Sequence, residues 1–239
     1  MANLKPRIWE LDALRGVCIL CVIVVHFLFD LSFFGGVDLT LPSWYFFVQE
    51  YGGAIFVVLS GVCATLGSRS VRRGLIVFGA GMLITAVTFG MYKLSMSGPD
   101  VVVKFGVLHL LGVCMIVYPA FKNLSPAALA PIAVISIAAG FAVRGVTVRP
   151  HFLFPFGLMY EGFTSSDYFP IFPHLGYFLA GVILGKTVYR EKRSLLPGSF
   201  QKTVPARFFC WCGRQSLFIY LLHQPLVYGI LELFLALRR

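Results

Sequence analysis

Arg15 and His26 are the two residues whose types and spacing most strongly suggest chemistry. Arg15 stands at the start of the first long apolar stretch, and His26 lies near its middle. At 1.5 Å of rise per residue, a helix would separate them by roughly 16 Å along its axis. A fixed cation would then lie at the membrane surface and an imidazole near the bilayer centre, where ionisable side chains are costly and are functional candidates by default. This spacing matches the reach of a coenzyme A arm between its phosphates and its thioester.

Two carboxylates accompany this histidine. Asp30 lies one helical turn beyond His26 on the same face, where it could fix the imidazole tautomer and raise its basicity. It could equally cap the end of the helix near the outer surface. Glu50, in the next apolar stretch, is a second candidate for the acceptor pocket, or an interfacial residue beside Gln49. The sequence leaves both alternatives open.

Three further histidines lie inside later apolar stretches, and we predict that they line the same pocket: His109, His174 and His223. Each needs a polar partner there, because burying an unpaired polar group is costly. A single one could instead be a hydrogen-bonded packing residue. No two histidines show His-x-x-x-His spacing, so we predict no metal site. A haem or quinone protein is a further alternative, which a coloured preparation would reveal.

A cluster of arginines follows the second apolar stretch: Arg69, Arg72 and Arg73. In a helix, Arg69 and Arg72 lie about one turn apart. Guanidinium forks match phosphate geometry, and coenzyme A carries several phosphates. Together with Arg15, these residues are the candidates for binding acetyl-CoA. The alternative is that they only orient the chain and contact lipid phosphates.

The composition places these residues in a membrane. Of the 239 residues, 58% are hydrophobic and 13% are charged, and the mean hydropathy is +0.84. Soluble domains carry about 25% charged residues. Several apolar stretches reach the ~20 residues needed to cross a bilayer. We therefore predict an all-α polytopic transmembrane helix bundle, a single integral-membrane domain over residues 1–239, and no nucleic-acid partner despite the net charge of +10.

Seven spanning helices are predicted, at about 13–34, 44–66, 73–92, 104–121, 126–143, 169–187 and 213–236. The apolar segment 152–160, in the loop before the sixth, is too short to cross and would lie at the interface or re-enter. Gly181-x-x-x-Gly185 and the Gly79-Ala80-Gly81 cluster predict close helix contacts. With the N-terminus in the cytoplasm, fourteen of the 20 lysines and arginines fall on the inner side, as the positive-inside rule favours.

Acyl transfer across the membrane is the chemistry that uses all of these parts. Cytoplasmic acetyl-CoA would dock its phosphates on the arginines and bring its thioester to His26. The imidazole would then either accept the acetyl group or deprotonate an acceptor hydroxyl or amine that arrives from outside. The alternative is a small transporter or channel with a His/Asp proton relay. Against it, the sequence shows no pair of Gly/Pro-broken helices at matching positions in two halves.

Motifs spread over nearly the whole chain add to this hypothesis: Arg7-x-x-x-Leu11-Asp12-x-Leu14-Arg15-Gly16, Phe56-x-x-Leu59-Ser60-Gly61, Phe105-Gly106-Val107-Leu108-His109, Tyr168-Phe169-Pro170-x-x-Pro173-x-x-Gly176 and Gly213-Arg214-x-Ser216-Leu217-x-x-Tyr220-x-x-His223-Gln224-Pro225. With the intramembrane His26, they resemble bacterial membrane proteins related to the catalytic domain of heparan-α-glucosaminide N-acetyltransferase. The Arg15–His26 spacing and Arg69-x-x-Arg72 are also similar to the wider transmembrane acyltransferase superfamily, including the acyltransferase-3 glycan O-acetylases.

The resemblance implies an acetyl-CoA-dependent membrane acyltransferase in which His26 is catalytic and three arginines bind the coenzyme: Arg15, Arg69 and Arg72. The animal lysosomal enzymes place their active histidine in the loop after the first helix. Here the loop 31–43 contains no histidine, so the acyltransferase-3 arrangement is the closer one. The implied acceptor is an extracytoplasmic glycan or small molecule, and the implied location is a bacterial inner (plasma) membrane. A homodimer is left open.

Overall fold

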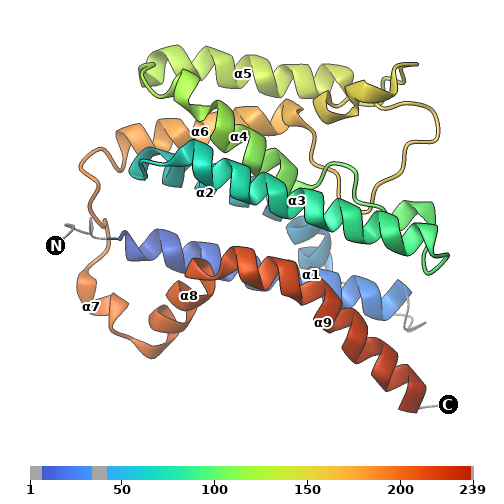
Figure 1. The fold of residues 1–239 in the computed structure, drawn as a ribbon. Helices are drawn as coiled ribbons and strands as arrows, with labels where there is room; N and C mark the ends of the chain where they lie inside the picture. Colours follow the sequence, from blue (N-terminus) through green and yellow to red (C-terminus); the bar gives the residue numbers. More distant parts are fainter. Residues whose placement is uncertain (1–6, 34–41, 238–239) are drawn as a thin grey trace. The chain divides into compact units, whose positions relative to one another are not determined.

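The computed structural model describes residues 7–33 and 42–237, apart from the side chains at positions 50, 231, 232 and 234–237. These residues form helices and two isolated β-bridges, without strands. The helices, labelled in Figure 1, are α1 (Trp9–Phe33), α2 (Ser43–Leu66), α3 (Ser70–Lys93), η1 (Pro99–Val101), α4 (Val107–Phe121), α5 (Pro126–Val143), η2 (His151–Phe156), α6 (Ile171–Thr187), α7 (Gly198–Gln201), α8 (Val204–Arg214) and α9 (Ser216–Leu237). The prediction of an all-α chain is confirmed.

Length and composition identify some of these helices as membrane spans. Among the described residues, three helices are long and apolar enough to cross a bilayer: Trp9–Ser32, Ser70–Lys93 and Pro126–Val143. α2 meets the same criterion only as two segments that meet at a bend of 42°. Two further apolar helices, Val107–Phe121 and Ser216–Ile230, are shorter. Each of the seven predicted stretches largely coincides with a helix, but only three or four of them qualify as spans.

The chain divides into two compact units. The first consists of residues 1–56 and 191–239, and it contains α1, the start of α2, and α7 to α9. The second consists of residues 57–190, and it contains the remainder of α2 and the helices α3 to α6.

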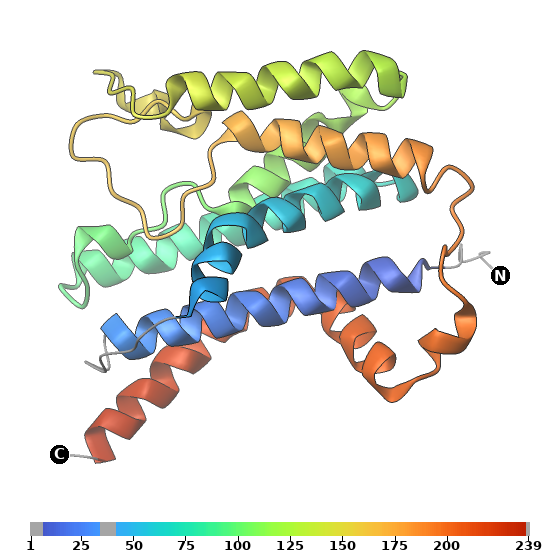
Figure 2. The same ribbon diagram turned by 180° about the vertical axis from the view of Figure 1, so that it is seen from behind.

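In the first unit, two glycines bring α1 and α8 into close contact. A methyl group added at Gly16 would overlap the carbonyl oxygen of Phe209, and one added at Gly213 would overlap that of Asp12. Small residues allow helix backbones to approach this closely. Both views of the ribbon show α9 running beside α1 and diverging from it toward the C-terminus (Figures 1 and 2). The start of α9 is therefore held near the middle of α1.

The beginning of α1 is fixed by polar contacts to the segments before and within α8. The Glu10 carboxylate accepts hydrogen bonds from the Ser194 hydroxyl at 2.6 Å and from the Leu195 N–H at 2.7 Å. The Cys210 thiol donates to the Trp9 carbonyl oxygen at 3.3 Å. An acidic residue in the first turn also complements the helix dipole. These contacts hold Lys202, which follows α7, and the basic residues of α8 at the N-terminal end of α1.

In the second unit, the predicted close contact at Gly181-x-x-x-Gly185 is confirmed. Gly181 lies against the carbonyl oxygen of Val58 on α2, and Gly185 lies against the Thr65 side chain. The pairs α3–α4 and α5–α6 also pack together. Only residues without a side chain fit at such crossings, since a methyl group would overlap the neighbouring backbone.

Gly181→Ala is expected to destabilise the protein by about 1–3 kcal/mol, because the added methyl group has no room against Val58. Gly79→Ala on α3 is the matched control, since its added methyl group meets nothing within 4 Å. Both substitutions gain up to about 1 kcal/mol of helix propensity, so Gly79→Ala should be neutral or stabilising. Thermal unfolding in one detergent compares the two variants. Equal midpoints would show that the α2–α6 contact is not tight.

The loop between α5 and α6 is folded rather than extended. The apolar segment predicted to lie at the interface or to re-enter overlaps η2, and the Tyr168 hydroxyl donates to the Phe154 carbonyl oxygen there at 2.6 Å. Burial raises the pKa of Tyr168 to about 12, so this phenol stays protonated and keeps donating at neutral pH. Lys104 donates to the Tyr160 hydroxyl at 2.8 Å and lies over the Phe163 ring.

Candidate functional site

His26 of α1 and His223 of α9 lie against each other in the first unit. Their ring centroids are 5.0 Å apart, and the rings meet edge to face at 60°. His223 is buried, with 7% of its surface exposed, and His26 is half-buried. Both rings lie well inside apolar helices. The structure thus brings together two of the four histidines that the sequence placed in one pocket.

The hydrogen bonding of His223 fixes its protonation pattern. Its Nδ1 lies 2.6 Å from the Tyr220 carbonyl oxygen, which can only accept, so Nδ1 carries the proton in the neutral ring. The other nitrogen, Nε2, then carries a lone pair. This atom is buried and has no hydrogen-bond partner among the described residues. An unpaired buried acceptor costs about 1–3 kcal/mol, so one beside a cavity is a candidate for contact with a bound group.

Asp30 contacts α9 rather than the histidine on its own helix. It is almost fully buried, with 2% exposed, and its Oδ2 accepts a hydrogen bond from the Gln224 side-chain amide at 2.8 Å. No hydrogen bond joins Asp30 to His26 in the described part of the chain. The carboxylate therefore links α1 to the residue that follows His223, and it positions the two helices that carry the rings.

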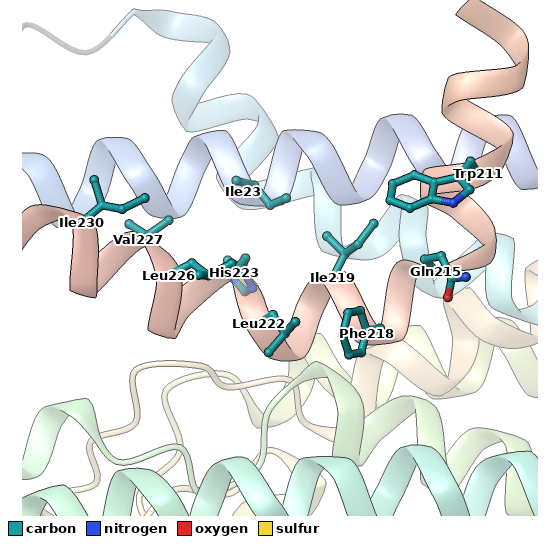
Figure 3. A pocket seen from close by; sticks show the side chains of 10 residues that line it. All are labelled: Ile23, Trp211, Gln215, Phe218, Ile219, Leu222, His223, Leu226, Val227 and Ile230. Carbon is teal, nitrogen blue, oxygen red and sulfur yellow. The ribbon is translucent and has the colours of Figure 1, made fainter.

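An apolar groove of about 540 Å³ opens beside the histidine pair. Figure 3 shows it running along α9 from Trp211 and Gln215 at one end to Ile230 at the other, with His223 between them and Ile23 of α1 on the opposite wall. Sites that bind small molecules typically have such a volume, apolar walls and few polar groups. The groove would accept a long, narrow, mostly apolar group and would bring its end to the His223 ring.

Arg15 lies in the first unit and is paired. Its guanidinium is 3.4 Å from the Asp12 carboxylate, which is also 3.7 Å from Arg7. Two cations thus share one carboxylate at the start of α1. The cluster retains a net positive charge at the end of the helix from which the predicted donor arrives.

Three other predicted donor-binding residues lie at the N-terminus of α3 in the second unit: Arg69, Arg72 and Arg73. All three are exposed, and none is in a salt bridge within the described ranges. Arg69 occupies the N-cap position without capping the helix through its side chain. Cations at the positive end of a helix are each unfavourable by about 0.3–1 kcal/mol, and an anion bound there relieves this cost. The arrangement favours phosphate binding.

Both ring nitrogens of His109 have hydrogen-bond partners inside the second unit. Its Nδ1 accepts the Gly106 N–H at 3.2 Å, which leaves the proton on Nε2, 3.3 Å from the Thr85 hydroxyl oxygen. The Thr85 hydroxyl in turn donates to the Val103 carbonyl oxygen. The ring also stacks on Phe105 at a centroid distance of 5.5 Å. Both ring nitrogens are therefore occupied, which favours the packing alternative for this histidine.

His174 and Glu50 complete the predicted set. His174 is half-buried on α6, and its Nδ1 donates to the Pro170 carbonyl oxygen at 2.7 Å. Its ring contacts the rings of Phe169 and Tyr177. Glu50 belongs to α2, but its side chain lies outside the described residues. The pocket-lining role of these residues stays a prediction.

The comparison with known families bears directly on this arrangement. A family model described as heparan-alpha-glucosaminide N-acetyltransferase, catalytic, matches residues 7–225, which is most of the chain. The chain belongs to this family. The resemblance stated from the motifs is confirmed, and family membership implies acyltransferase activity in a membrane. No curated protein and no solved structure gives a match.

The stretch matched by the heparan-alpha-glucosaminide N-acetyltransferase family contains both rings of the histidine pair and ends just after Gln224. Gln224 belongs to one of the motifs, but the sequence assigns it no role in the site. The signal was its position directly after an intramembrane histidine, in a helix where a side-chain amide needs a partner. Only the packing of α9 on α1 identifies that partner as Asp30.

Proposed function

We propose that this protein moves an acetyl group from cytoplasmic acetyl-CoA to a hydroxyl or amine of an extracytoplasmic acceptor, a glycan or a related small molecule, in a bacterial inner membrane. The observation that carries the proposal is the contact of His26 with His223, at 5.0 Å between ring centroids, inside a chain of an acetyltransferase family. Imidazoles are costly to bury inside an apolar helix bundle, so two of them in contact there are a candidate functional site.

The reaction needs a proton carrier at this place. The carbon–sulfur bond of the thioester breaks, and a bond from the acetyl carbon to the acceptor oxygen or nitrogen forms. The acceptor loses one proton, and the coenzyme sulfur leaves as a thiol after gaining one. An imidazole performs this exchange either as the base that takes the acceptor's proton or as the nucleophile that holds the acetyl group in between. We assign this role to His26.

The neighbouring groups support that role. His223 presents the lone pair of Nε2 within the same cluster, so it can take up the proton that His26 must pass on. Asp30 holds the two helices together through Gln224. Arg15, Arg69, Arg72 and Arg73 are the proposed contacts of the donor's phosphates, since guanidinium groups pair with phosphate in a bidentate manner.

Transfer is tested with the purified protein in vesicles of neutral lipid, with radiolabelled acetyl-CoA outside and glucosamine or an oligosaccharide inside. The expected result is labelled acceptor inside the vesicles and one free thiol released outside for each acetyl group transferred. Acetyl-CoA at 100 times its Kd should also raise the free energy of unfolding by about 2.7 kcal/mol. Absence of both transfer and stabilisation would refute the proposal. Proton flux through the same vesicles without acetyl-CoA would favour the transporter instead.

A further inference from the structure

A second cavity in the first unit, of about 550 Å³, is lined by three cations: Lys202, Arg207 and Arg214. They follow α7 or belong to α8, and all three are exposed. The other lining residues are Gln201, Cys210 and Trp211, so no carboxylate faces this cavity. No side-chain hydrogen bond or salt bridge engages the three cations in the part of the chain that the structure describes. Like charges gathered without a counter-charge favour a multiply charged anion.

The nearby carboxylates are engaged elsewhere. Asp12 pairs with Arg15 and Arg7, and Glu10 accepts from Ser194 and Leu195. Neither therefore neutralises this basic cavity by direct contact. The cavity also lies on the helix that packs against the N-terminal half of α1, which is the end predicted to face the cytoplasm.

The basic cavity and the apolar groove are neighbours, since Trp211 lines both. Beyond Trp211, the groove follows one face of α9 through Gln215 and Ile219 to His223 (Figure 3). Ser216 and His223 are seven residues apart, or about 10 Å of helix rise. Arg214 lies two residues before Ser216. The length from Arg214 to His223 is therefore comparable with the roughly 16 Å between Arg15 and His26 on α1. The two cavities together suit a ligand with an anionic head and a long thin arm.

The far end of this path carries an independent sign of a ligand. His223 is more than nine-tenths buried, it lines the groove, and its Nε2 makes no hydrogen bond among the described residues. A simple lipid tail would leave this acceptor unsatisfied. An arm that ends in polar, reactive atoms would not.

We propose that Lys202, Arg207 and Arg214 bind phosphate groups of the acyl donor, and that the groove past Trp211 holds its arm so that the thioester reaches His223 and His26. This assignment rests on the proposed function and names its donor site. It adds a phosphate-binding set in the first unit that is separate from the arginines of α3.

The test compares two triple variants that remove the same charge. Lys202→Ala/Arg207→Ala/Arg214→Ala removes the three cations that line the basic cavity. Arg190→Ala/Lys192→Ala/Arg193→Ala removes three exposed cations from the preceding loop. Binding of acetyl-CoA is measured by calorimetry in discs of phosphatidylcholine. We expect the first variant to raise the Kd at least 30-fold and the loop variant less than 2-fold. S-acetylpantetheine, which carries no phosphate, should bind both variants as it binds the unmodified protein.

A groove variant tests the arm separately. Ile219→Trp should raise the KM for acetyl-CoA and for S-acetylpantetheine by the same factor, because the blocked segment is common to both. All targeted side chains are exposed or half-buried, and thermal unfolding confirms that each variant folds. The single variants Arg207→Ala and Arg214→Ala, each expected to weaken binding about 3- to 10-fold, serve if the triple variant does not fold.

The outcomes separate this inference from the proposed function. If the unmodified protein binds and uses acetyl-CoA but the cavity variant has an unchanged Kd, the inference is wrong and the proposed function stands. The inference is also wrong if the cavity variant keeps its affinity for acetyl-CoA and loses only its binding to phosphatidylglycerol in the discs. The cavity would then be a site for a lipid headgroup. If the unmodified protein neither binds nor uses acetyl-CoA, the proposed function itself fails.

Discussion

His26→Ala is expected to lower the rate of acyl transfer by about 10³-fold, while the affinity for acetyl-CoA changes less than 2-fold. The loss follows from removing the proposed proton carrier, since general acid–base catalysis contributes about 10²–10⁴-fold. Donor binding survives because Arg15, a proposed phosphate contact on the same helix, lies roughly 16 Å along the axis from this ring. Transfer in vesicles gives the rate, and calorimetry gives the affinity.

His26→Gln is the matched control for packing. Glutamine fills much of the imidazole's volume and keeps a polar atom beside His223, but it neither takes up a proton nor forms a stable acyl intermediate. It should be as inactive as the alanine variant and should unfold at a temperature close to that of the unmodified protein. Full turnover in either variant would remove His26 from the mechanism. Loss of activity together with a large loss of stability in both would reduce it to a packing residue.

Helix boundaries were well predicted where local chemistry determines them. α5 was predicted over 126–143 and is observed as Pro126–Val143. Ser125 caps it by accepting the Ala128 N–H at 3.2 Å, and Pro126 is suited to the first helical position. Gly145, with φ of +81°, follows its end. These signals are local in sequence and do not depend on packing.

α8 was missed for the opposite reason. Arg207 and Arg214 interrupt its apolar residues, so hydropathy treats the segment as part of a basic loop. Its amphipathic face is defined by contact with α1 at Gly213. Only this packing shows that these cations line a cavity and do not belong to a basic loop exposed to solvent.

The candidate site was predictable in depth but not in pairing. The sequence placed His26 and His223 well inside apolar helices, and it predicted that the histidines converge. It gave no means of deciding which ones meet, because side-chain partners on different helices depend on tertiary contacts. His109 illustrates this point, since its partners Thr85 and the Gly106 N–H come from another helix and a helix cap.

His223→Ala is expected to lower the rate of transfer by about 10²-fold with little change in the KM for acetyl-CoA. In the proposed mechanism the Nε2 lone pair accepts a proton next to His26, so its loss removes one proton-transfer step. The pH dependence of the rate should also change, which a purely structural residue would not cause. His223→Asn separates the two possibilities, because its amide keeps a donor for the Tyr220 carbonyl oxygen but has no basic nitrogen. We expect it to be as slow as His223→Ala; an asparagine variant with normal rate and an unchanged pH profile would show that His223 only supports the packing of α9 on α1.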